Sequence, residues 1–244
     1  MTSKAKVSHS AKSRQTGAAR GKVKALLFDF GGTLAFLDFD LLAREFSREG
    51  RKLDPLTLEH AEYAGRAAID RHLMGGRRDV IASYAEFFRD WMNAAGIPDE
   101  EIPAHGERFR AIHREATLWR VVRPGTFETL ERLKSAGYKL AIVSNAEGQV
   151  ESDCRRFGLA PYFDTIIDSH VVGVEKPDPR IFKIALDRLG IAPEEARFTG
   201  DIYSVDILGA RAAGIEAALV DLHGRYDWVE HEKIRHISEI HPLD

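Results

Sequence analysis

Four polar residues stand where short apolar runs of the sequence end, and a fifth lies in a loop further along. Asp29 follows ALLF, Ser144 and Asn145 follow LAIV, Asp201 follows ARFTG, and Lys176 lies in the segment GVEKPDP. Carboxylates bind hard cations, whereas a hydroxyl, an amide and an ammonium group bind phosphoryl oxygens. If these side chains meet in the folded chain, they suit chemistry at a phosphoryl group with the help of Mg²⁺.

Each of these residues also has an ordinary structural explanation when it is taken alone. Asp29 and Asp201 are good helix N-caps, Ser144 and Asn145 suit a turn, and Lys176 suits a solvated surface. The case for chemistry therefore depends on whether the fold brings them to one place.

Apolar runs that are short enough for strands alternate with helical patterns in this chain. Strands are expected within residues 25–34, 138–145, 163–169, 196–201 and 215–221. Helices are expected over 126–137, 147–158, 178–190 and 203–214, where apolar residues recur three or four apart and a glycine ends each pattern. This alternation predicts an α/β, Rossmann-like parallel sheet with helices on both faces. Ligands bind such sheets at the carboxyl ends of the strands, where the polar residues would meet.

A long insert separates the first strand from the second. Its amphipathic stretches, near 39–50, 56–74, 79–95 and 99–119, predict helices and contain no convincing strand. An insert of this length forms a module of its own. We therefore predict an α/β core of residues 23–36 and 121–244 and an α-helical bundle cap of residues 37–120. Trp91 and Trp119 fall at helical spacing and are expected to be core residues rather than a ligand platform.

The beginning of the chain and the remainder differ in charge. Residues 1–24 hold seven Lys or Arg and no acid, and the rest of the chain holds 28 basic against 38 acidic residues. We predict a disordered basic tail over residues 1–22. Its Ser and Arg content also allows an organellar transit peptide, whereas a nucleic-acid arm is less favoured because the acidic body offers no matching basic face. With one cysteine, Cys154, and no long apolar stretch, we expect a cytoplasmic protein without nucleic-acid or membrane partners, as a monomer or homodimer.

Four segments together resemble the motifs of the haloacid dehalogenase superfamily, in the subfamily whose helical cap lies between the first two motifs. LLFDFGGTL resembles the first motif, IVSN the second, GVEKPDPRIF the third and TGDIYSVDILGARAAG the fourth. The resemblance covers about residues 23–244 and implies a Mg²⁺-dependent phosphatase of a small phosphorylated metabolite, acting through an aspartyl phosphate. The implied site residues are Asp29 as nucleophile, Thr33 beside it, Ser144 as phosphate ligand, Lys176, and the metal ligands Asp201 and Asp206.

Elementary chemistry agrees with these roles. The Gly31-Gly32 pair lets the backbone bend, so that the carbonyl of Gly31 can face the cation beside Asp29 and Asp201. Lys176 and Mg²⁺ would neutralise the phosphoryl oxygens, Ser144 would donate hydrogen bonds to them, and Asn145 would bind substrate or orient nearby groups. Asp206 would bind the metal through water or restrain Lys176, although a helix N-terminal acid is its simpler explanation.

The chain departs from the phosphatase pattern at Gly31, where those enzymes usually have a second aspartate that protonates the departing alcohol. General acid catalysis contributes about 10²- to 10⁴-fold. Either the cap supplies a substitute, or the leaving group needs little protonation, or turnover is slow. Most of the cap arginines, which include Arg66, are expected to be solvated, and a few to reach the site and bind a second anionic group.

Three alternatives remain open. A 2-haloacid dehalogenase also lacks the second aspartate, but the GD pair at 200–201 favours Mg²⁺ users. A phosphonatase needs a cap lysine for a Schiff base, and Lys52, the only lysine of the cap, is poorly spaced for that role. The third alternative is a weakly active or inactive protein that binds a phosphorylated ligand or a partner.

Overall fold

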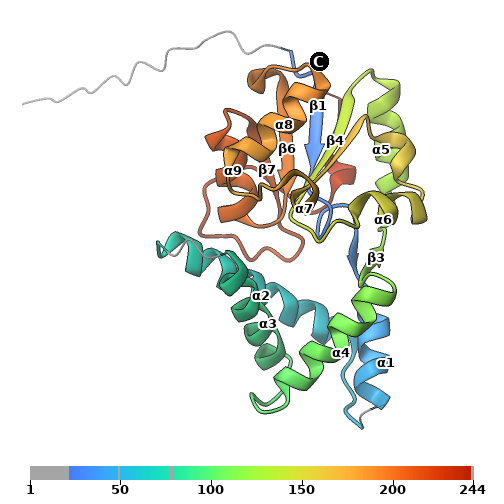
Figure 1. Ribbon diagram of the computed structural model, residues 1–244, viewed down its shortest axis with the longest axis vertical. Helices are drawn as coiled ribbons and strands as arrows, with labels where there is room; N and C mark the ends of the chain where they lie inside the picture. Colours follow the sequence, from blue (N-terminus) through green and yellow to red (C-terminus); the bar gives the residue numbers. More distant parts are fainter. Residues whose placement is uncertain (1–21, 49, 77–79, 243–244) are drawn as a thin grey trace, which may run out of the picture.

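The computed structural model describes residues 22–48, 50–76 and 80–242 (Figure 1). The predicted basic tail therefore lies almost wholly outside the described residues. A parallel sheet of six strands forms the core, in the order β5-β4-β1-β6-β7-β8. The strands are β1 (Ala25–Phe28), β4 (Lys139–Ser144), β5 (Thr165–Asp168), β6 (Ala196–Gly200), β7 (Glu216–Val220) and β8 (Lys233–Ile234). The predicted parallel α/β sheet is confirmed.

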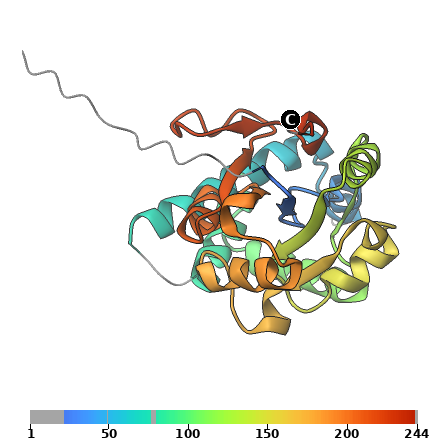
Figure 2. The same ribbon diagram turned by 90° about the horizontal axis from the view of Figure 1, so that it is seen from above.

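Central strand β1 explains why the sheet has two covered faces. All four of its residues are buried, and successive side chains point to opposite sides. Leu27 belongs to an apolar cluster with Phe182, whereas Leu26 belongs to a second cluster with Leu130. Helices α8 (Pro179–Leu189) and α9 (Leu208–Ala212) cover the first face, and α5 (Thr126–Ser135) and α6 (Val150–Arg156) the second (Figure 2).

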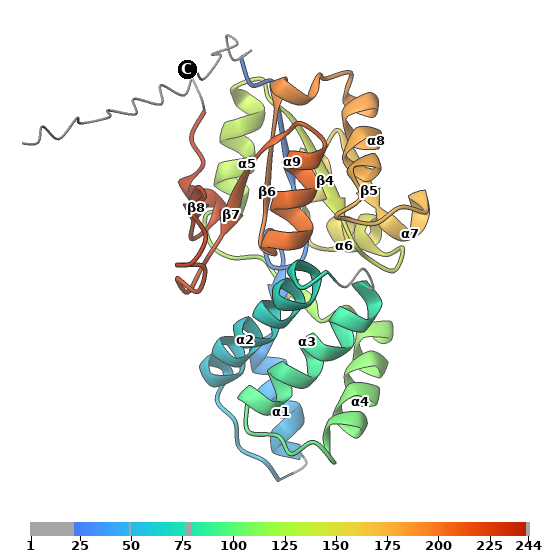
Figure 3. The same ribbon diagram turned by 90° about the vertical axis from the view of Figure 1, so that its left-hand side faces the viewer.

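Four further helices lie beyond the carboxyl ends of the strands (Figures 1 and 3). They are α1 (Phe39–Arg48), α2 (Pro55–Met74), α3 (Val80–Ala94) and α4 (Ile102–Glu115). Their inner faces form a separate apolar cluster that includes Phe46, Leu58 and Trp91. Because this cluster is separate from those of the sheet, we propose that the helices form the cap as a module of its own.

A two-stranded antiparallel ribbon joins this cap to the core. It pairs β2 (Phe36–Leu37) with β3 (Trp119–Val121). The expectation of no strand within residues 37–120 is thus wrong at both ends, and α4 ends at Glu115 rather than reaching 119. Strands of two or three residues carry too little alternation to be read from a sequence. Trp119 consequently lies on a strand, between the apolar clusters of cap and core, and not on a helix.

The segment after β6 also differs from expectation. A regular helix over 203–214 was expected, but the chain forms a π-helical turn, η3 (Tyr203–Ile207), before α9 begins. Such turns are rare and commonly occur at functional sites. Among the described residues, none of the helices combines the length and the apolar character needed to cross a bilayer.

Candidate active site

The chain reverses sharply just after β1. The amide of Gly32 donates to the carbonyl of Ala35 at 2.7 Å, and Gly32 has a φ of +77°. A Cβ atom at Gly32 would lie 2.5 Å from Oδ2 of Asp201 and would also overlap the guanidinium of Arg66. Only glycine fits here, for both backbone and steric reasons. The turn leaves Asp29 at the strand end, where it caps no helix.

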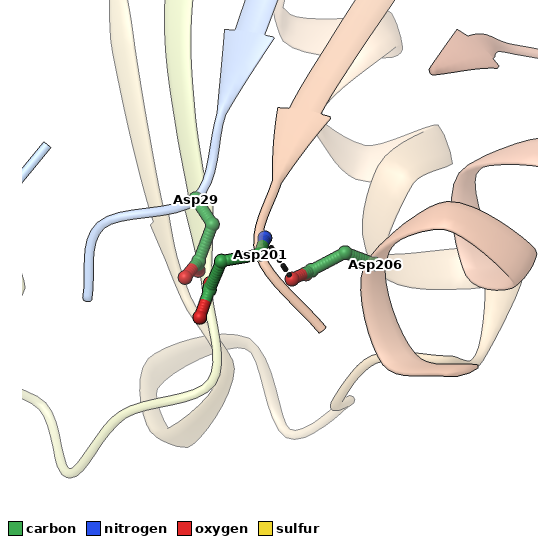
Figure 4. Close-up of side chains that lie close together, drawn as sticks. All are labelled: Asp29, Asp201 and Asp206. Carbon is green, nitrogen blue, oxygen red and sulfur yellow. Dashed lines mark hydrogen bonds between the residues drawn. The ribbon is translucent and has the colours of Figure 1, made fainter. Parts of the chain in front are cut away.

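Three carboxylates gather at this edge of the sheet (Figure 4). One oxygen from each of Asp29, Asp201 and Asp206 lies within 4.8 Å of the others, and the three residues are 7%, 3% and 1% exposed. Lys176 joins them: its Nζ lies 2.5 Å from Oδ1 of Asp29 and 2.6 Å from Oδ1 of Asp206. Lys176 is 2% exposed, so its interpretation as a solvated surface charge is set aside.

Asp206 connects the lysine to the turn that carries Asp201. While its Oδ1 accepts from Lys176, its Oδ2 accepts from the amides of Asp201 at 3.0 Å and Ile202 at 2.9 Å. A Cβ atom at Gly200 would lie 2.5 Å from Cγ of Asp206, which explains the glycine before Asp201. Asp206 therefore fixes the position of Asp201 relative to the ammonium group.

The charged groups of the cluster shift one another's pKa values. Burial raises the pKa of Asp29 above its ordinary value, against the opposing effect of Lys176. Burial would lower the pKa of Lys176, but the carboxylates of Asp206 and Asp29 outweigh burial and raise it. The lysine is therefore charged at neutral pH and favours the ionised form of its neighbours.

Asn145 positions the backbone of that lysine. Its Nδ2 donates to the carbonyl of Lys176 at 2.9 Å, and its Oδ1 accepts from the amide of Lys176 at 2.7 Å. Both ends of the amide side chain are thus engaged with one residue. We therefore propose a positioning role for Asn145 in place of the substrate contact expected from the sequence.

Two buried hydroxyl residues complete the expected set. Ser144 ends β4 and is 4% exposed, and Thr33 follows the glycine turn and is 1% exposed. Within the described part of the chain, Oγ1 of Thr33 has no hydrogen-bond partner. A buried hydroxyl without a partner costs about 1–3 kcal/mol, so this atom is suited to meet a ligand.

Helix α2 brings charged cap residues into the site, which the sequence analysis did not foresee for any particular residue. Arg66 is 4% exposed; its Nε donates to Glu62 at 2.8 Å, and its guanidinium forms an ion pair with Oδ2 of Asp201. One turn further on, Asp70 accepts from the amide of Ser204 and from the hydroxyl of Tyr226, both at 2.7 Å. The spacing of four residues between positions 62, 66 and 70 places one polar stripe against the core.

Trp119 faces the position where a side chain is missing at Gly31. A Cβ atom built there would lie 3.3 Å from Cδ2 and 3.4 Å from Cε3 of the indole. The contacting atoms belong to the carbon face of the ring. Among the described side chains, the one opposite Gly31 is therefore aromatic and not acidic.

Tyr84 of α3 is a further cap residue that sequence reasoning missed. Its residue surface is 38% exposed, yet burial of its hydroxyl raises its pKa well above 10. The groups that act on this hydroxyl electrostatically are Lys176, Asp29 and Asp206, followed by Glu175. The phenol therefore lies within electrostatic range of the cluster, and its raised pKa keeps it protonated at neutral pH.

Comparison with known proteins places this geometry in a family. A family model described as haloacid dehalogenase-like hydrolase matches residues 23–214. The pyrophosphatase PpaX of Bacillus velezensis is 35% identical over 201 residues, 81% of this chain and 82% of that protein. The chain spans about half the length of the first curated relatives it matches, 50% and 44%.

Solved structures give the same assignment. A crystal structure of a HAD phosphatase from Thermococcus onnurineus is 29% identical with a TM-score of 0.55, and a dehalogenase crystal structure is 25% identical with a TM-score of 0.60. Each alignment covers 89% of this chain and 95% of the other. The chain therefore belongs to the haloacid dehalogenase-like hydrolase family.

Proposed function

We propose that this hydrolase is a Mg²⁺-dependent phosphatase of small phosphorylated metabolites that works through a phosphorylated Asp29. The observation that carries the proposal is the cluster of three buried carboxylates around the ammonium group of Lys176 at the end of β1. A phosphoryl group is an anion that needs positive charge on its oxygens before a carboxylate can attack it.

The donor set fits a magnesium ion. Asp29 and Asp201 supply carboxylate oxygens, and the glycine turn makes the carbonyl of Gly31 a suitable third ligand. Both oxygens of Asp206 already accept hydrogen bonds, so Asp206 would contribute through a water molecule. When bound, Mg²⁺ would act as a Lewis acid on the phosphoryl oxygens.

The residues of the chain do the rest of the chemistry. Asp29 attacks phosphorus, and Lys176 compensates the negative charge of the transferring group. Ser144 and the unpartnered hydroxyl of Thr33 would hold phosphoryl oxygens, and Asn145 keeps Lys176 in place. Cytoplasmic location and a monomeric or homodimeric state stay predictions.

Haloacid dehalogenation is the competing function, supported by Gly31 and by the structural likeness to a dehalogenase. Dehalogenation by a carboxylate displaces halide from carbon and needs no divalent cation. The arrangement of Asp201 beside Asp29 supports the phosphatase instead, because two carboxylates this close offer a pair of ligands for a divalent cation, which dehalogenation does not use.

One assay separates these functions. Purified protein is expected to release phosphate from 4-nitrophenyl phosphate when Mg²⁺ is present and to stop when EDTA removes the cation. Activity that persists in EDTA, or halide release from a 2-haloacid, would refute the phosphatase. Tight phosphate binding by calorimetry without turnover would indicate a binding protein.

Arg66 is expected to compete with the cation for Asp201. Because the guanidinium pairs with Oδ2 of Asp201, a metal must displace it. The variant Arg66→Gln should bind Mn²⁺ about tenfold more tightly, a difference of about 1.4 kcal/mol. Electron paramagnetic resonance titration of free Mn²⁺ measures this affinity without substrate. Arg71→Gln is the matched control, since Arg71 is on the same helix and 64% exposed. Unchanged or weaker binding in Arg66→Gln would contradict the competition.

A further inference from the structure

The wall beside the nucleophile determines how a leaving group can depart. When Asp29 attacks phosphorus, the bond from phosphorus to the leaving oxygen breaks and its electron pair stays on that oxygen. An alkoxide is too basic to leave this way and needs a proton, whereas a phosphate, carboxylate or phenolate leaves as an anion. The presence or absence of an acid near Asp29 therefore selects the substrate class.

Position 31 offers no acid, and the structure shows what fills the space. Gly31 has no side chain, and carbon atoms of Trp119 would lie 3.3–3.5 Å from any Cβ atom placed there. Trp119 stays in place because it belongs to β3, which pairs with β2, and because it packs against the apolar clusters of both core and cap. The indole is thus a fixed part of the wall.

The acidic groups that α2 brings to the core are engaged elsewhere. The carboxylate of Glu62 accepts from Nε of Arg66, and that of Asp70 accepts from Ser204 and Tyr226. Tyr84 lies within electrostatic range of Lys176 and Asp29, and the variant Tyr84→Phe tests whether it donates a proton.

We infer that this enzyme acts on phosphoryl compounds whose leaving group departs without a proton, namely phosphoric anhydrides and acyl phosphates, and discriminates against phosphate esters of aliphatic alcohols. The inference rests on the proposed phosphatase activity and narrows its substrate class. In the second half of the reaction, water attacks phosphorus of phospho-Asp29, the bond to the carboxylate oxygen breaks, and the proton of water passes to the released phosphate. Asp29 is thereby restored as a carboxylate.

A series of leaving groups tests the inference. kcat/KM is measured in Mg²⁺ for acetyl phosphate, inorganic pyrophosphate, 4-nitrophenyl phosphate, phenyl phosphate and an alkyl phosphate. We expect kcat/KM to fall at least about 100-fold from 4-nitrophenyl to phenyl phosphate, and further for the alkyl ester, because no acid offsets the growing basicity of the leaving oxygen. Similar values across the aryl and alkyl esters would overturn the inference.

Variants then test whether the dependence of kcat/KM on the leaving group arises from the residues at positions 31 and 119. The double variant Gly31→Asp/Trp119→Ala supplies an acid and the space for it, and should flatten the dependence by raising kcat/KM for the alkyl ester relative to 4-nitrophenyl phosphate. Trp119→Ala alone removes the ring without adding an acid and should keep the steep dependence. If kcat/KM of Trp119→Ala no longer depends on the leaving group, the inference is wrong. It is also wrong if the wild type shows a weak dependence on the leaving group that becomes strong in Tyr84→Phe, because that result would identify Tyr84 as the proton donor.

The phosphatase activity and its substrate class can be refuted separately. If none of the compounds releases phosphate, the proposed function itself is wrong. If phosphate is released with a flat dependence on the leaving group, the phosphatase stands and the substrate class is wrong.

Discussion

Phosphate release is expected to fall by roughly 10⁴-fold or more when Asp29 is replaced by asparagine, since removal of a catalytic nucleophile has effects of this order. An amide cannot form the phosphorylated intermediate, and it also removes one metal ligand. The loss should appear in kcat with 4-nitrophenyl phosphate and Mg²⁺. A variant that keeps more than a hundredth of the wild-type kcat would exclude Asp29 as nucleophile.

The melting temperature of the variant distinguishes a loss of catalysis from misfolding. Burial raises the pKa of Asp29, so folding disfavours its ionised form, and a neutral side chain of the same shape should not lower the melting temperature. Lys176 keeps Asp206 as its partner at 2.6 Å. The matched control is Asp168→Asn, which changes another buried strand-end aspartate, one whose Oδ1 accepts from the amides of Gly148 and His170. That variant should retain activity within about tenfold.

Replacing Lys176 with methionine is expected to produce the largest loss of stability. The change removes the ammonium group shared by Asp29 and Asp206 and leaves buried like charges uncompensated. Removing one partner from a buried ion pair costs about 3–5 kcal/mol, which denaturant unfolding in EDTA would measure. Lys183→Met is the control, because Lys183 is 72% exposed and pairs with Asp187 on the surface of α8.

Magnesium should reverse part of that loss. A cation bound among the carboxylates replaces some of the missing positive charge, and ligand binding to the folded state stabilises it. The melting temperature of Lys176→Met should therefore rise more on addition of Mg²⁺ than that of the wild type. An equal or smaller rise would mean that the cation does not bind among these carboxylates.

The strand-end residues were predictable from the sequence because their placement follows from local pattern. Apolar runs predict buried parallel strands, and the topology then brings Asp29, Ser144 and Asp201 to one edge without any knowledge of side-chain contacts. Lys176 was placed by its loop and by the resemblance. The geometry adds the reason for its position, which is the pair of hydrogen bonds between its backbone and the side chain of Asn145.

The cap contributions were not predictable in the same way. Arg66 and Asp70 look like ordinary charges of an amphipathic helix, and their partners Asp201 and Ser204 lie more than 130 residues further along the chain. The contact between Trp119 and Gly31 depends on a short ribbon that leaves almost no pattern in the sequence. Contacts of this kind are decided by tertiary packing and not by local propensity.

The ribbon of β2 and β3 also governs how the chain tolerates change. Phe36 pairs with Val121 and Leu37 with Trp119, so the insert leaves and rejoins the core at adjacent points. For the sheet, the whole insert is equivalent to a hairpin loop, and the entropy of closing a loop grows only slowly with its length. Insertions, deletions or exchange of the helices between these two points would therefore change the cap while the strand pairing of the sheet stays as before.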